Sequence, residues 1–534
     1  MNFQSIAKLL VATLILYFLS YKQEIKAQNS NQAWQWWQES PQHSKFVGVG
    51  LKQFIENSIS KSFSAPIIIA VLDTGLDTAH AIIQPYLWRN KKEISNNGKD
   101  DDQNGYTDDV AGWNFLGGTS QNLIYAQPEA VREYVRLKTK MENSDVSLSK
   151  SEQILWQEIE SKYQRDKGAN EKKLKEYRET LFQYQQVDET LTTVTRLLLN
   201  HFKDSIISYH QIKEWNPVND SLSTAKAISI SIMEAVDTSL PILAIKKEFE
   251  NAIQELKTTV SNYEIAVSLY NTDINFRQAI GDDANNWSTN YGNNQLKDEN
   301  GHGTSVAGII CVGIDACYRH GIKPNITIMP VRIVPSGGDE YDKDVANGIR
   351  YAVDNGAKII NLSFGKYYSP NVKWVEEAIS YGVTKGVLFV HAAGNEGFDL
   401  DVKNHFPVPP SSATNNWIEV GASGKTADEN LLASFSNYGR KTVDVFAPGV
   451  ELLCPAPNMQ WQISQGTSLA APIVSLCAAL LWAQQPNATA NQIKSMLVSK
   501  VNTYQTHVFV PKAKKNFKFN QLSKKGGVIN IAQR

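Results

Sequence analysis

Residues 67–77 read IIIAVLDTGLD, and this segment sets the fold class of the chain. Its first six residues are all apolar, and such a run suits a β-strand that is covered on both faces. The run ends in Asp73, a carboxylate that is costly to bury unless it is hydrogen-bonded or paired. Gly75 lets the backbone turn sharply just after it. Taken alone, this pattern fits a strand-ending aspartate in a turn as well as it fits a functional residue.

Further apolar runs and helical patterns alternate along the chain. The runs are residues 326–331, 358–362, 387–390 and 417–420, and helical spacing lies at residues 345–353 and 372–383. This alternation predicts an α/β fold with a doubly wound, mostly parallel sheet and helices on both faces. Right-handed crossovers place the functional loops of such a sheet at the carboxyl ends of its strands.

The middle of the chain, residues 122–275, shows no clear strand pattern. Apolar residues recur there at spacings of three and four in two long series, Leu174, Tyr177, Leu181, Tyr184, Val187, Leu191, Val194, Leu198 and Ile245, Phe249, Ile253, Leu256, Val260, Tyr263, Val267, Tyr270. Both series predict amphipathic helices. We expect an antiparallel helical hairpin inserted into the α/β domain, with a break marked by Pro217 and Pro241. It either limits access or docks a protein partner, or it is a stabilising elaboration.

Composition excludes several classes of protein. The 534 residues include 53 Lys and Arg against 54 Asp and Glu, so the net charge is -1. No basic block appears, and we expect no nucleic-acid partner. The four cysteines, Cys311, Cys317, Cys454 and Cys477, are too few for a disulfide scaffold. Cys311 and Cys317 form either a small loop disulfide or buried thiols, and none of the four suggests a metal site.

The N-terminus carries a targeting pattern. Lys8 precedes an apolar run at residues 9–19. This run is short for a membrane-spanning helix but fits the core of a secretory signal peptide. We predict a signal peptide at residues 1–27, cleaved near Ala27, and export to a periplasmic or extracellular location. An uncleaved membrane anchor is the alternative.

Two later segments supply a histidine and a serine. Residues 300–310, NGHGTSVAGII, place His302 between glycines at the start of a buried helix, and residues 465–472, QGTSLAAP, place Ser468 at the mouth of a long apolar helix. A serine hydroxyl needs a base to take its proton, and histidine does this near neutral pH. A buried carboxylate such as Asp73 orients that histidine. Helix capping is the alternative reading for His302 and Ser468.

A fourth group would stabilise the oxyanion of acyl transfer. Residues 391–397, HAAGNEG, follow an apolar run, and Asn395 lies between glycines at the predicted strand end. We assign Asn395 as an oxyanion donor beside the backbone N–H of Ser468. A turn asparagine is the alternative reading.

These segments resemble the signatures of a known family. Residues 73–75, 302–304 and 466–472 are similar to the three signatures of the subtilisin family, and residues 392–395 are similar to its oxyanion segment. The resemblance covers about residues 65–120 and 290–500. It implies a serine endopeptidase of broad specificity that works through an acyl-enzyme, with the triad Asp73, His302 and Ser468. The competing hypotheses are a binding protein on an inactive subtilisin fold and an esterase of the same mechanism.

The resemblance also implies how a protein or peptide substrate is held. Residues 361–365, NLSFG, are similar to the segment that pairs with an extended substrate as an added strand. The substrate-binding residues implied in this way are Ser363, Phe364, Gly365, Ala392, Ala393 and Gly394. Because the last three are small, we expect a roomy pocket with broad preference for the side chain before the cut bond.

The resemblance divides the chain into a peptidase domain and additions to it. The domain comprises residues 65–121 and 276–505, and the inserted hairpin comprises residues 122–275. The additions at the ends are an arm at residues 28–64, rich in tryptophan at Trp34, Trp36 and Trp37, and a C-terminal extension at residues 506–534. The arm is too short for the folded propeptide of many family members, and the insertion is longer than the usual connection. We expect the arm to pack on the domain.

An acidic string offers a candidate ion site. Residues 100–109 read DDDQNGYTDD, and Asp100, Asp102, Asn104 and Asp108 are candidate calcium ligands. The glutamate that a full calcium loop would have at its twelfth position is replaced by Ala111. A hydrogen-bonded acidic turn is the alternative. Any ion here would be structural, and we expect catalysis to need no cofactor or metal.

Overall fold

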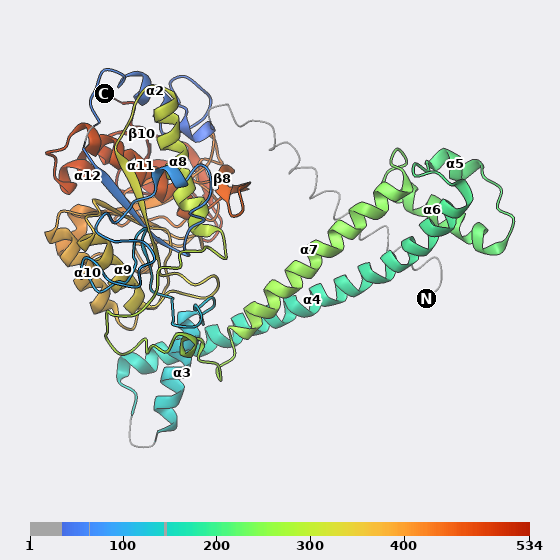
Figure 1. The fold of residues 1–534 in the computed structure, drawn as a ribbon, viewed down its shortest axis with the longest axis horizontal. Coiled ribbons are helices and arrows are strands. Elements are labelled where there is room, and N and C mark those ends of the chain that lie inside the picture. The colour runs from blue at the N-terminus through green and yellow to red at the C-terminus, as the bar shows by residue number, and fades with distance from the viewer. Residues whose placement is uncertain (1–34, 64, 144–146, 534) are drawn as a thin grey trace. The chain divides into compact units, whose positions relative to one another are not determined.

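The computed structural model describes residues 35–63, 65–143 and 147–533 (Figure 1). The predicted signal peptide, residues 1–27, and Trp34 lie outside the described residues. The described chain forms two compact units. We call Ala33–Ser149 together with Thr272–Arg534 the sheet unit, and Lys150–Asn271 the helical unit.

A nine-stranded sheet forms the centre of the sheet unit. The strand order is β10-β13-β7-β6-β5-β4-β1-β3-β2, and all neighbours are parallel except β10 and β13. The strands are β1 (Ile67–Asp73), β2 (Trp113–Asn114), β3 (Ile326–Arg332), β4 (Ile359–Leu362), β5 (Leu388–Ala392), β6 (Trp417–Ser423), β7 (Val445–Pro448), β10 (Val501–Thr503) and β13 (Gly527–Ile529). The predicted doubly wound, mostly parallel α/β fold is confirmed.

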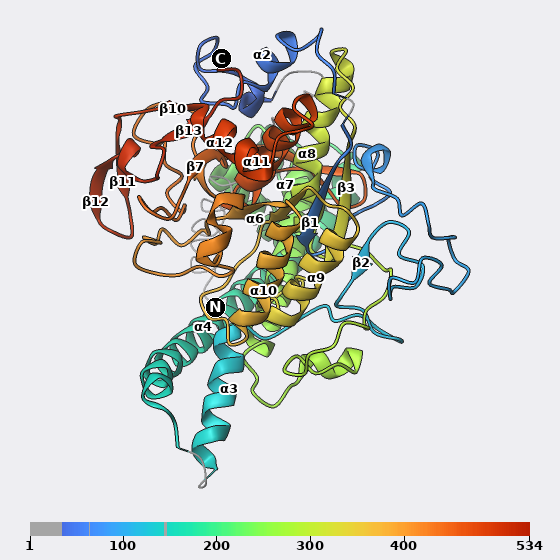
Figure 2. The same ribbon diagram turned by 90° about the vertical axis from the view of Figure 1, so that its left-hand side faces the viewer.

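Helices cover both faces of this sheet. Helices α8 (His302–Arg319) and α11 (Thr467–Gln484) lie on one face, and α9 (Asp342–Asp354) and α10 (Val372–Thr384) lie on the other (Figure 2). The central strand β1 contributes side chains to the cores on both faces. Ile69 packs with α8 and α11, while Ala70 packs with α9 and α10. Among the described helices, α11 alone is long and apolar enough to cross a membrane, but it is buried in this core.

Smaller elements surround the sheet. The helices are α2 (Leu51–Glu56), α3 (Glu129–Glu142) and α12 (Ala490–Ser499); two hairpins pair β8 (Leu452–Ala456) with β9 (Gln460–Ser464) and β11 (His507–Val510) with β12 (Lys515–Lys518). Short 3-10 helices lie at Trp36–Gln38, Gln84–Tyr86, Phe276–Ile280, Ser411–Asn416 and Phe519–Gln521.

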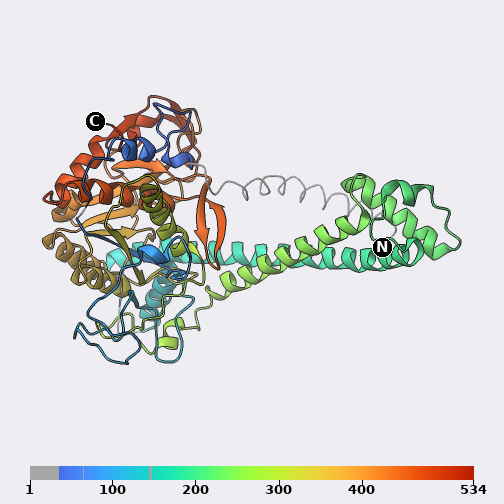
Figure 3. The ribbon, with the colours of Figure 1, turned by 45° about the horizontal axis from the view of Figure 1, so that its top comes forward.

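The helical unit contains two long helices that run side by side, α4 (Lys150–Phe202) and α7 (Ile242–Ser268), joined through α5 (Tyr209–Glu214) and α6 (Asp220–Val236) (Figure 3). Aromatic pairs link the long helices. Tyr184 stacks on Phe249 with ring centroids 4.8 Å apart, and Tyr177 stacks on Tyr263 at 5.1 Å. The apolar series read from the sequence thus face one another.

The units do not coincide with the predicted boundaries. Residues 122–149 and 272–275, expected in the hairpin, belong to the sheet unit. Leu123 and Ala126, which precede α3 and are not helical, are buried there with Leu116, so the lack of a strand pattern did not show which core this part of the chain joins. The C-terminal extension also contributes to the sheet through β13, because Val528 and Ile529 are buried.

The described part of the N-terminal arm, residues 35–63, packs within the sheet unit. Trp37 has no exposed surface and lies in the same core as α8 and α11. All four cysteines are buried free thiols. Burial, followed by the charge of Asp315, raises the pKa of Cys311, and burial raises the pKa of Cys317 to about 12. Of the two alternatives for these residues, the structure has the buried thiols.

Candidate functional site

Asp73 and His302 meet at the carboxyl end of the central strand. Asp73 is the last residue of β1, and His302 is the first residue of α8. The His302 Nδ1 atom lies 2.7 Å from Asp73 Oδ1, which also accepts a hydrogen bond from the backbone N–H of Thr74 at 2.8 Å. Two of the predicted catalytic residues are therefore in direct contact, although 229 positions separate them in the sequence.

Two glycines allow this contact. Gly75 has a φ angle of +110°, and a Cβ atom there would lie 2.6 Å from the Leu296 carbonyl oxygen. A Cβ atom on Gly303 would lie 2.1 Å from the carbonyl oxygen of Gly75. The turn after β1 and the first turn of α8 thus approach each other more closely than any side chain would allow.

Hydrogen bonds to Asp298, a buried carboxylate that the sequence did not single out, link these two turns. Asp298 accepts hydrogen bonds from the Thr74 hydroxyl at 2.8 Å and from the backbone N–H and hydroxyl of Thr304 at 2.8 and 2.7 Å. The Thr74 hydroxyl in turn accepts the backbone N–H of Gly303 at 2.9 Å. An acidic residue just before a helix start is a capping signal, so the sequence held a clue to Asp298.

Two opposing effects set the pKa of His302. Burial alone would lower it. The charge and hydrogen bond of Asp73, with a contribution from the charge of Asp298, outweigh burial and raise the pKa above 6.5. The side chain keeps 35% of its surface exposed, because its outer edge faces the cleft described next.

Ser468 and Asn395 share a cleft with His302. The cleft has a volume of about 280 Å3. Ser468 is the second residue of α11, where a backbone N–H has no partner within the helix. Asn395 Oδ1 accepts the N–H of Thr467 at 2.9 Å and its hydroxyl at 3.1 Å. These bonds fix the amide and leave its Nδ2 donor for the cleft.

Five of the six predicted substrate-binding residues line the same cleft. These are Ser363, Phe364, Gly365, Ala392 and Gly394. Ala393 does not line it, because its side chain is buried with Leu400 and Val443 on the other side of the segment. The family resemblance implied Ala392, Ala393 and Gly394 as one segment, and it did not distinguish the two directions in which their side chains point.

A histidine lies against the small residues of the cleft. His405, which the sequence analysis did not single out, lies against both segments. A Cβ atom on Gly365 would lie 2.3 Å from its Cε1 atom, and one on Gly394 would lie 3.0 Å from its Nε2 atom. Burial, and then the neighbouring His391, lower the pKa of His405 to about 3, so the ring is neutral. The ring occupies the space that the small residues leave.

The acidic loop is built partly from hydrogen bonds to backbone. Asp100 accepts the N–H groups of Asn104 and Gly105, and Asp108 accepts those of Asn97 and Gly98. Asn104 donates to Asp109 at 3.1 Å. Three of the four predicted ligands, Asp100, Asn104 and Asp108, thus form hydrogen bonds within the turn.

A different set of carboxylates comes together in this loop. Single oxygens of Glu93, Asp100 and Asp102 all lie within 4.8 Å of one another. Glu93 is 8% exposed; one of its oxygens accepts two backbone N–H groups, and the other, Oε2, is buried without a partner, as is Asp102 Oδ1. Among the described residues no Lys or Arg forms an ion pair with these three. Hard oxygen ligands with unsatisfied charge fit a calcium ion.

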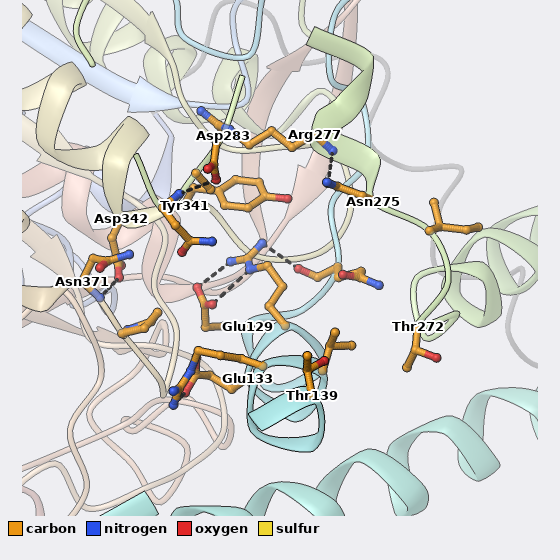
Figure 4. Close-up of a pocket in the computed structure, with 18 of the residues that line it drawn as sticks. Glu129, Glu133, Thr139, Thr272, Asn275, Arg277, Asp283, Tyr341, Asp342 and Asn371 are labelled. Atoms are coloured by element: carbon orange, nitrogen blue, oxygen red, sulfur yellow. Dashed lines mark hydrogen bonds and ion pairs between the residues drawn. The ribbon is translucent and has the colours of Figure 1, made fainter. Parts of the chain in front are cut away.

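A larger cavity, of about 530 Å3, lies beside α3 (Figure 4). Its charged side chains pair with one another, as Glu129 does with Arg132 at 2.6 Å. Burial would raise the pKa of Glu129, but Arg132 and Lys366 outweigh it and lower the pKa to about 2. Arg132 also donates to the backbone carbonyls of Asp339 and Glu340, which line the cleft. These hydrogen bonds connect helix α3 to one wall of the cleft.

The fold and the cleft together define a class of protein. A carboxylate–imidazole pair, a serine at a helix N-terminus and a fixed amide meet at the carboxyl edge of a parallel sheet. These are the groups that hydrolases with a serine nucleophile use.

Comparison with known proteins places the chain more narrowly. The model of the subtilase family matches residues 64–523, and the chain belongs to this family. It is 38% identical over 206 residues to the cell wall-associated protease of Bacillus subtilis (strain 168), which covers 38% of this chain and 22% of that protein. It is 39% identical over 191 residues to the thermophilic serine proteinase of Bacillus sp. (strain AK1), which covers 36% and 44%.

A shorter relative is matched over more of its length. Subtilisin Savinase of Lederbergia lenta is 34% identical over 206 residues, which covers 39% of this chain and 72% of that protein. The chain thus spans less than half the length of the first two relatives. A crystal structure of a cold adapted subtilisin-like serine proteinase aligns with a TM-score of 0.35 at 27% identity, over 45% of this chain and 76% of that one.

Proposed function

We propose that the protein is a serine endopeptidase that hydrolyses peptide bonds in proteins. The observation that carries this proposal is the contact between His302 Nδ1 and Asp73 Oδ1 in the cleft that also holds Ser468. Family membership supports it. The test is reaction with a fluorophosphonate probe, mapped to Ser468 by mass spectrometry, together with digestion of an unfolded protein such as casein. An inactive binding protein would do neither, and an esterase would be labelled but would leave casein intact.

The geometry suggests a role for each group. His302 takes the proton of Ser468 Oγ as it attacks the substrate carbonyl, and later delivers it to the leaving amine. Asp73 keeps Nδ1 protonated and stabilises the imidazolium that forms. The oxyanion then accepts hydrogen bonds from the Ser468 N–H and from Asn395 Nδ2. Every one of these donors is held in place before the reaction begins.

Removing the Asn395 donor should slow turnover. For Asn395→Ala we expect kcat to fall by about 10² to 10³, the range seen for the equivalent loss in subtilisin, with KM little changed. Asn395→Asp is the matched control, since it retains the oxygen that accepts from Thr467 and lacks the donor. The kcat of Asn395→Asp should be at least as low as that of Asn395→Ala. A change confined to KM, or an active Asp variant, would contradict the role of Nδ2.

The substrate is proposed to bind in an extended form. The cleft is lined on one side by residues 336–340 and on the other by Ser363, Phe364 and Gly365. A peptide between them would pair through its backbone, which gives affinity with little demand on sequence. His405 restricts the adjoining pocket, so the broad specificity expected from small residues is narrowed toward short side chains at that one position.

We further propose that Glu93, Asp100 and Asp102 hold a structural calcium ion. Binding to the folded state alone stabilises it, by about 2.7 kcal/mol when the free ion is at 100 times its Kd. In the background of Ser468→Ala, which prevents self-digestion, calcium should raise Tm, and Glu93→Gln should abolish the increase. Asp108→Asn is the control, because Asp108 belongs to the same loop but is not one of the three carboxylates whose oxygens come together. An equal calcium response in all three proteins would exclude this site.

We propose that the helical unit limits which large substrates enter the cleft, or binds a protein partner. All the residues given chemical roles above belong to the sheet unit. Replacing Lys150–Asn271 with a short Gly/Ser linker should leave cleavage of small peptides within about twofold, while cleavage of folded proteins changes. Circular dichroism checks the fold. An equal loss on peptides and proteins would show that the unit is structural support.

Export is proposed from the N-terminal sequence pattern. One relative is described as cell wall-associated, which agrees with this proposal.

A further inference from the structure

A buried, hydrogen-bonded pair of a histidine and a glutamate lies inside the central sheet. His391 on β5 and Glu419 on β6 are opposite each other in the parallel register. His391 has no exposed surface, and Glu419 is 4% exposed. The Nδ1 atom of His391 lies 2.9 and 3.0 Å from the two carboxylate oxygens. Their neighbours along both strands, Val390 and Val420 among them, are apolar. A buried pair of this kind contributes little to stability compared with apolar residues of the same shape, so its presence calls for another reason.

The second nitrogen of His391 points to the proposed substrate segment. His391 Nε2 lies 3.0 Å from the backbone carbonyl oxygen of Phe364. A carbonyl only accepts hydrogen bonds, so Nε2 carries a proton. The remaining proton of the pair lies between Nδ1 and Glu419, and wherever it sits, Nε2 remains the donor to Phe364. Glu419 is held from its other side by Trp417 Nε1 at 2.9 Å.

The same atoms do not favour a metal ion. One ligand atom from each of His391, His405 and Glu419 lies within 4.8 Å of the others. Both ring nitrogens of His391 are already engaged, by Glu419 and by the Phe364 carbonyl. A metal would have to displace one of these hydrogen bonds, so the hydrogen-bonded pair accounts for the residues better.

The bond to Phe364 determines the direction of the neighbouring peptide groups. Phe364 lies two residues beyond the end of β4, which pairs with β5 on one side and with β1 on the other. Successive carbonyl groups along an extended chain point to opposite edges. With the Phe364 carbonyl held toward β5, those of Ser363 and Gly365 point to the opposite edge, where residues 336–340 form the far wall of the cleft.

We propose that His391 and Glu419 are positioning residues, which set the affinity for extended peptides by holding the Phe364 carbonyl and thereby aligning Ser363 and Gly365 with the substrate backbone. This inference rests on the proposed peptidase function and deepens it. Neither side chain touches the substrate or the reacting groups. The effect is therefore expected on substrates that have a backbone to pair, and not on the chemistry at Ser468.

Two substitutions at one position separate the two hydrogen bonds. The amide nitrogen of a glutamine reaches the place of Nε2, so His391→Gln keeps a donor for Phe364. The amide nitrogen of an asparagine reaches only the place of Nδ1, so His391→Asn keeps a donor for Glu419 and loses the one for Phe364. The substrates are a tetrapeptide amide and an ester of its last amino acid. The tetrapeptide has a backbone to pair, and the ester does not.

For His391→Asn we expect kcat/KM on the tetrapeptide to fall about tenfold, mainly through KM, since one hydrogen bond is lost. The ester should be hydrolysed within twofold of the wild-type rate. His391→Gln should stay within about threefold on both substrates. Glu419→Gln provides a second variant of nearly the same shape. Its amide oxygen can accept from Trp417 Nε1 while its amide nitrogen donates to Nδ1, so neutral His391 keeps the proton on Nε2 and KM for the tetrapeptide should stay within about threefold of the wild-type value.

Three outcomes would overturn the inference. These are an equal loss on both substrates, a His391→Gln variant as poor as His391→Asn, and a Glu419→Gln variant whose KM rises as much as that of His391→Asn. Thermal unfolding of each variant in the Ser468→Ala background shows whether it folds. Should His391→Asn fail to fold, His391→Gln decides, because a tenfold loss on the tetrapeptide there would show that a donor at the place of Nε2 is not what matters. A folded wild-type protein that hydrolyses neither substrate would instead refute the proposed function itself.

Discussion

Replacing Ser468 with alanine is expected to reduce turnover on casein and on peptides by about 10⁶, the loss measured when the nucleophile of subtilisin is removed. Among the described residues no hydrogen bond of the fold uses the Ser468 hydroxyl; its backbone carbonyl, which the substitution retains, accepts from Ser363 at 2.8 Å. The hydroxyl is thus free for chemistry, and Tm should stay within a few degrees of the wild-type value.

The matched control is Ser464→Ala, four residues earlier on β9 and also partly exposed. It should keep full activity and full labelling by the fluorophosphonate probe, while Ser468→Ala loses both. Casein hydrolysis by a purified, folded Ser468→Ala protein at more than about one part in 10³ of the wild-type rate would mean that another residue is the nucleophile.

The edge of the sheet that holds the candidate site could be predicted from the sequence, for a physical reason. Strands buried on both faces must be apolar, so the run before Asp73 was visible in the sequence. The carboxyl ends of parallel strands share one edge, where functional loops lie. The pairing of Asp73 with His302, which lie 2.7 Å apart, is an expectation from the complementary chemistry of the two residues and from the family resemblance, and not from the apolar runs.

Residues that act through tertiary contacts were not predictable in this way. Asp298 lies in a loop, and its role depends on Thr74 and Thr304 coming together. In the sequence, His405 is an isolated histidine outside the apolar runs. His391 is a polar residue that directly follows the apolar run at residues 387–390. Only the packing of β5 against β4 and β6 shows that one narrows the pocket and the other holds a backbone carbonyl.

The helical boundaries failed for a related reason. A spacing of three and four predicts that a segment is helical, and α4 and α7 carry the expected apolar series. The spacing carries no information on the partner of the apolar face. Leu123 and Ala126 therefore looked no different from residues of the helical unit, although they are buried in the sheet unit.

Asp73→Asn tests charge separately from geometry. Asp73 Oδ1 accepts both Thr74 N–H and His302 Nδ1–H, while Oδ2 is buried without a partner. The oxygen of an asparagine can take the place of Oδ1 and keep both bonds, so the orientation of His302 is retained and the charge alone is lost. We expect turnover to fall by less than about 10⁴, the loss found for this substitution in a trypsin-type triad, where the histidine also takes the wrong tautomer.

The pH dependence identifies the cause of that loss. In the wild type, Asp73 raises the pKa of His302 against the opposing effect of burial. Activity requires neutral His302, so kcat/KM should fall as the pH drops through this raised pKa. Without the charge of Asp73, the effect of burial outweighs the remaining effects and the pKa of His302 falls. The decrease of kcat/KM on the acid side should therefore occur at lower pH. Asp77→Asn, which removes a charge from the same turn without contacting His302, should leave both the pH of this decrease and the rate nearly unchanged. A large loss of turnover with an unshifted decrease on the acid side would show that Asp73 acts by orientation alone.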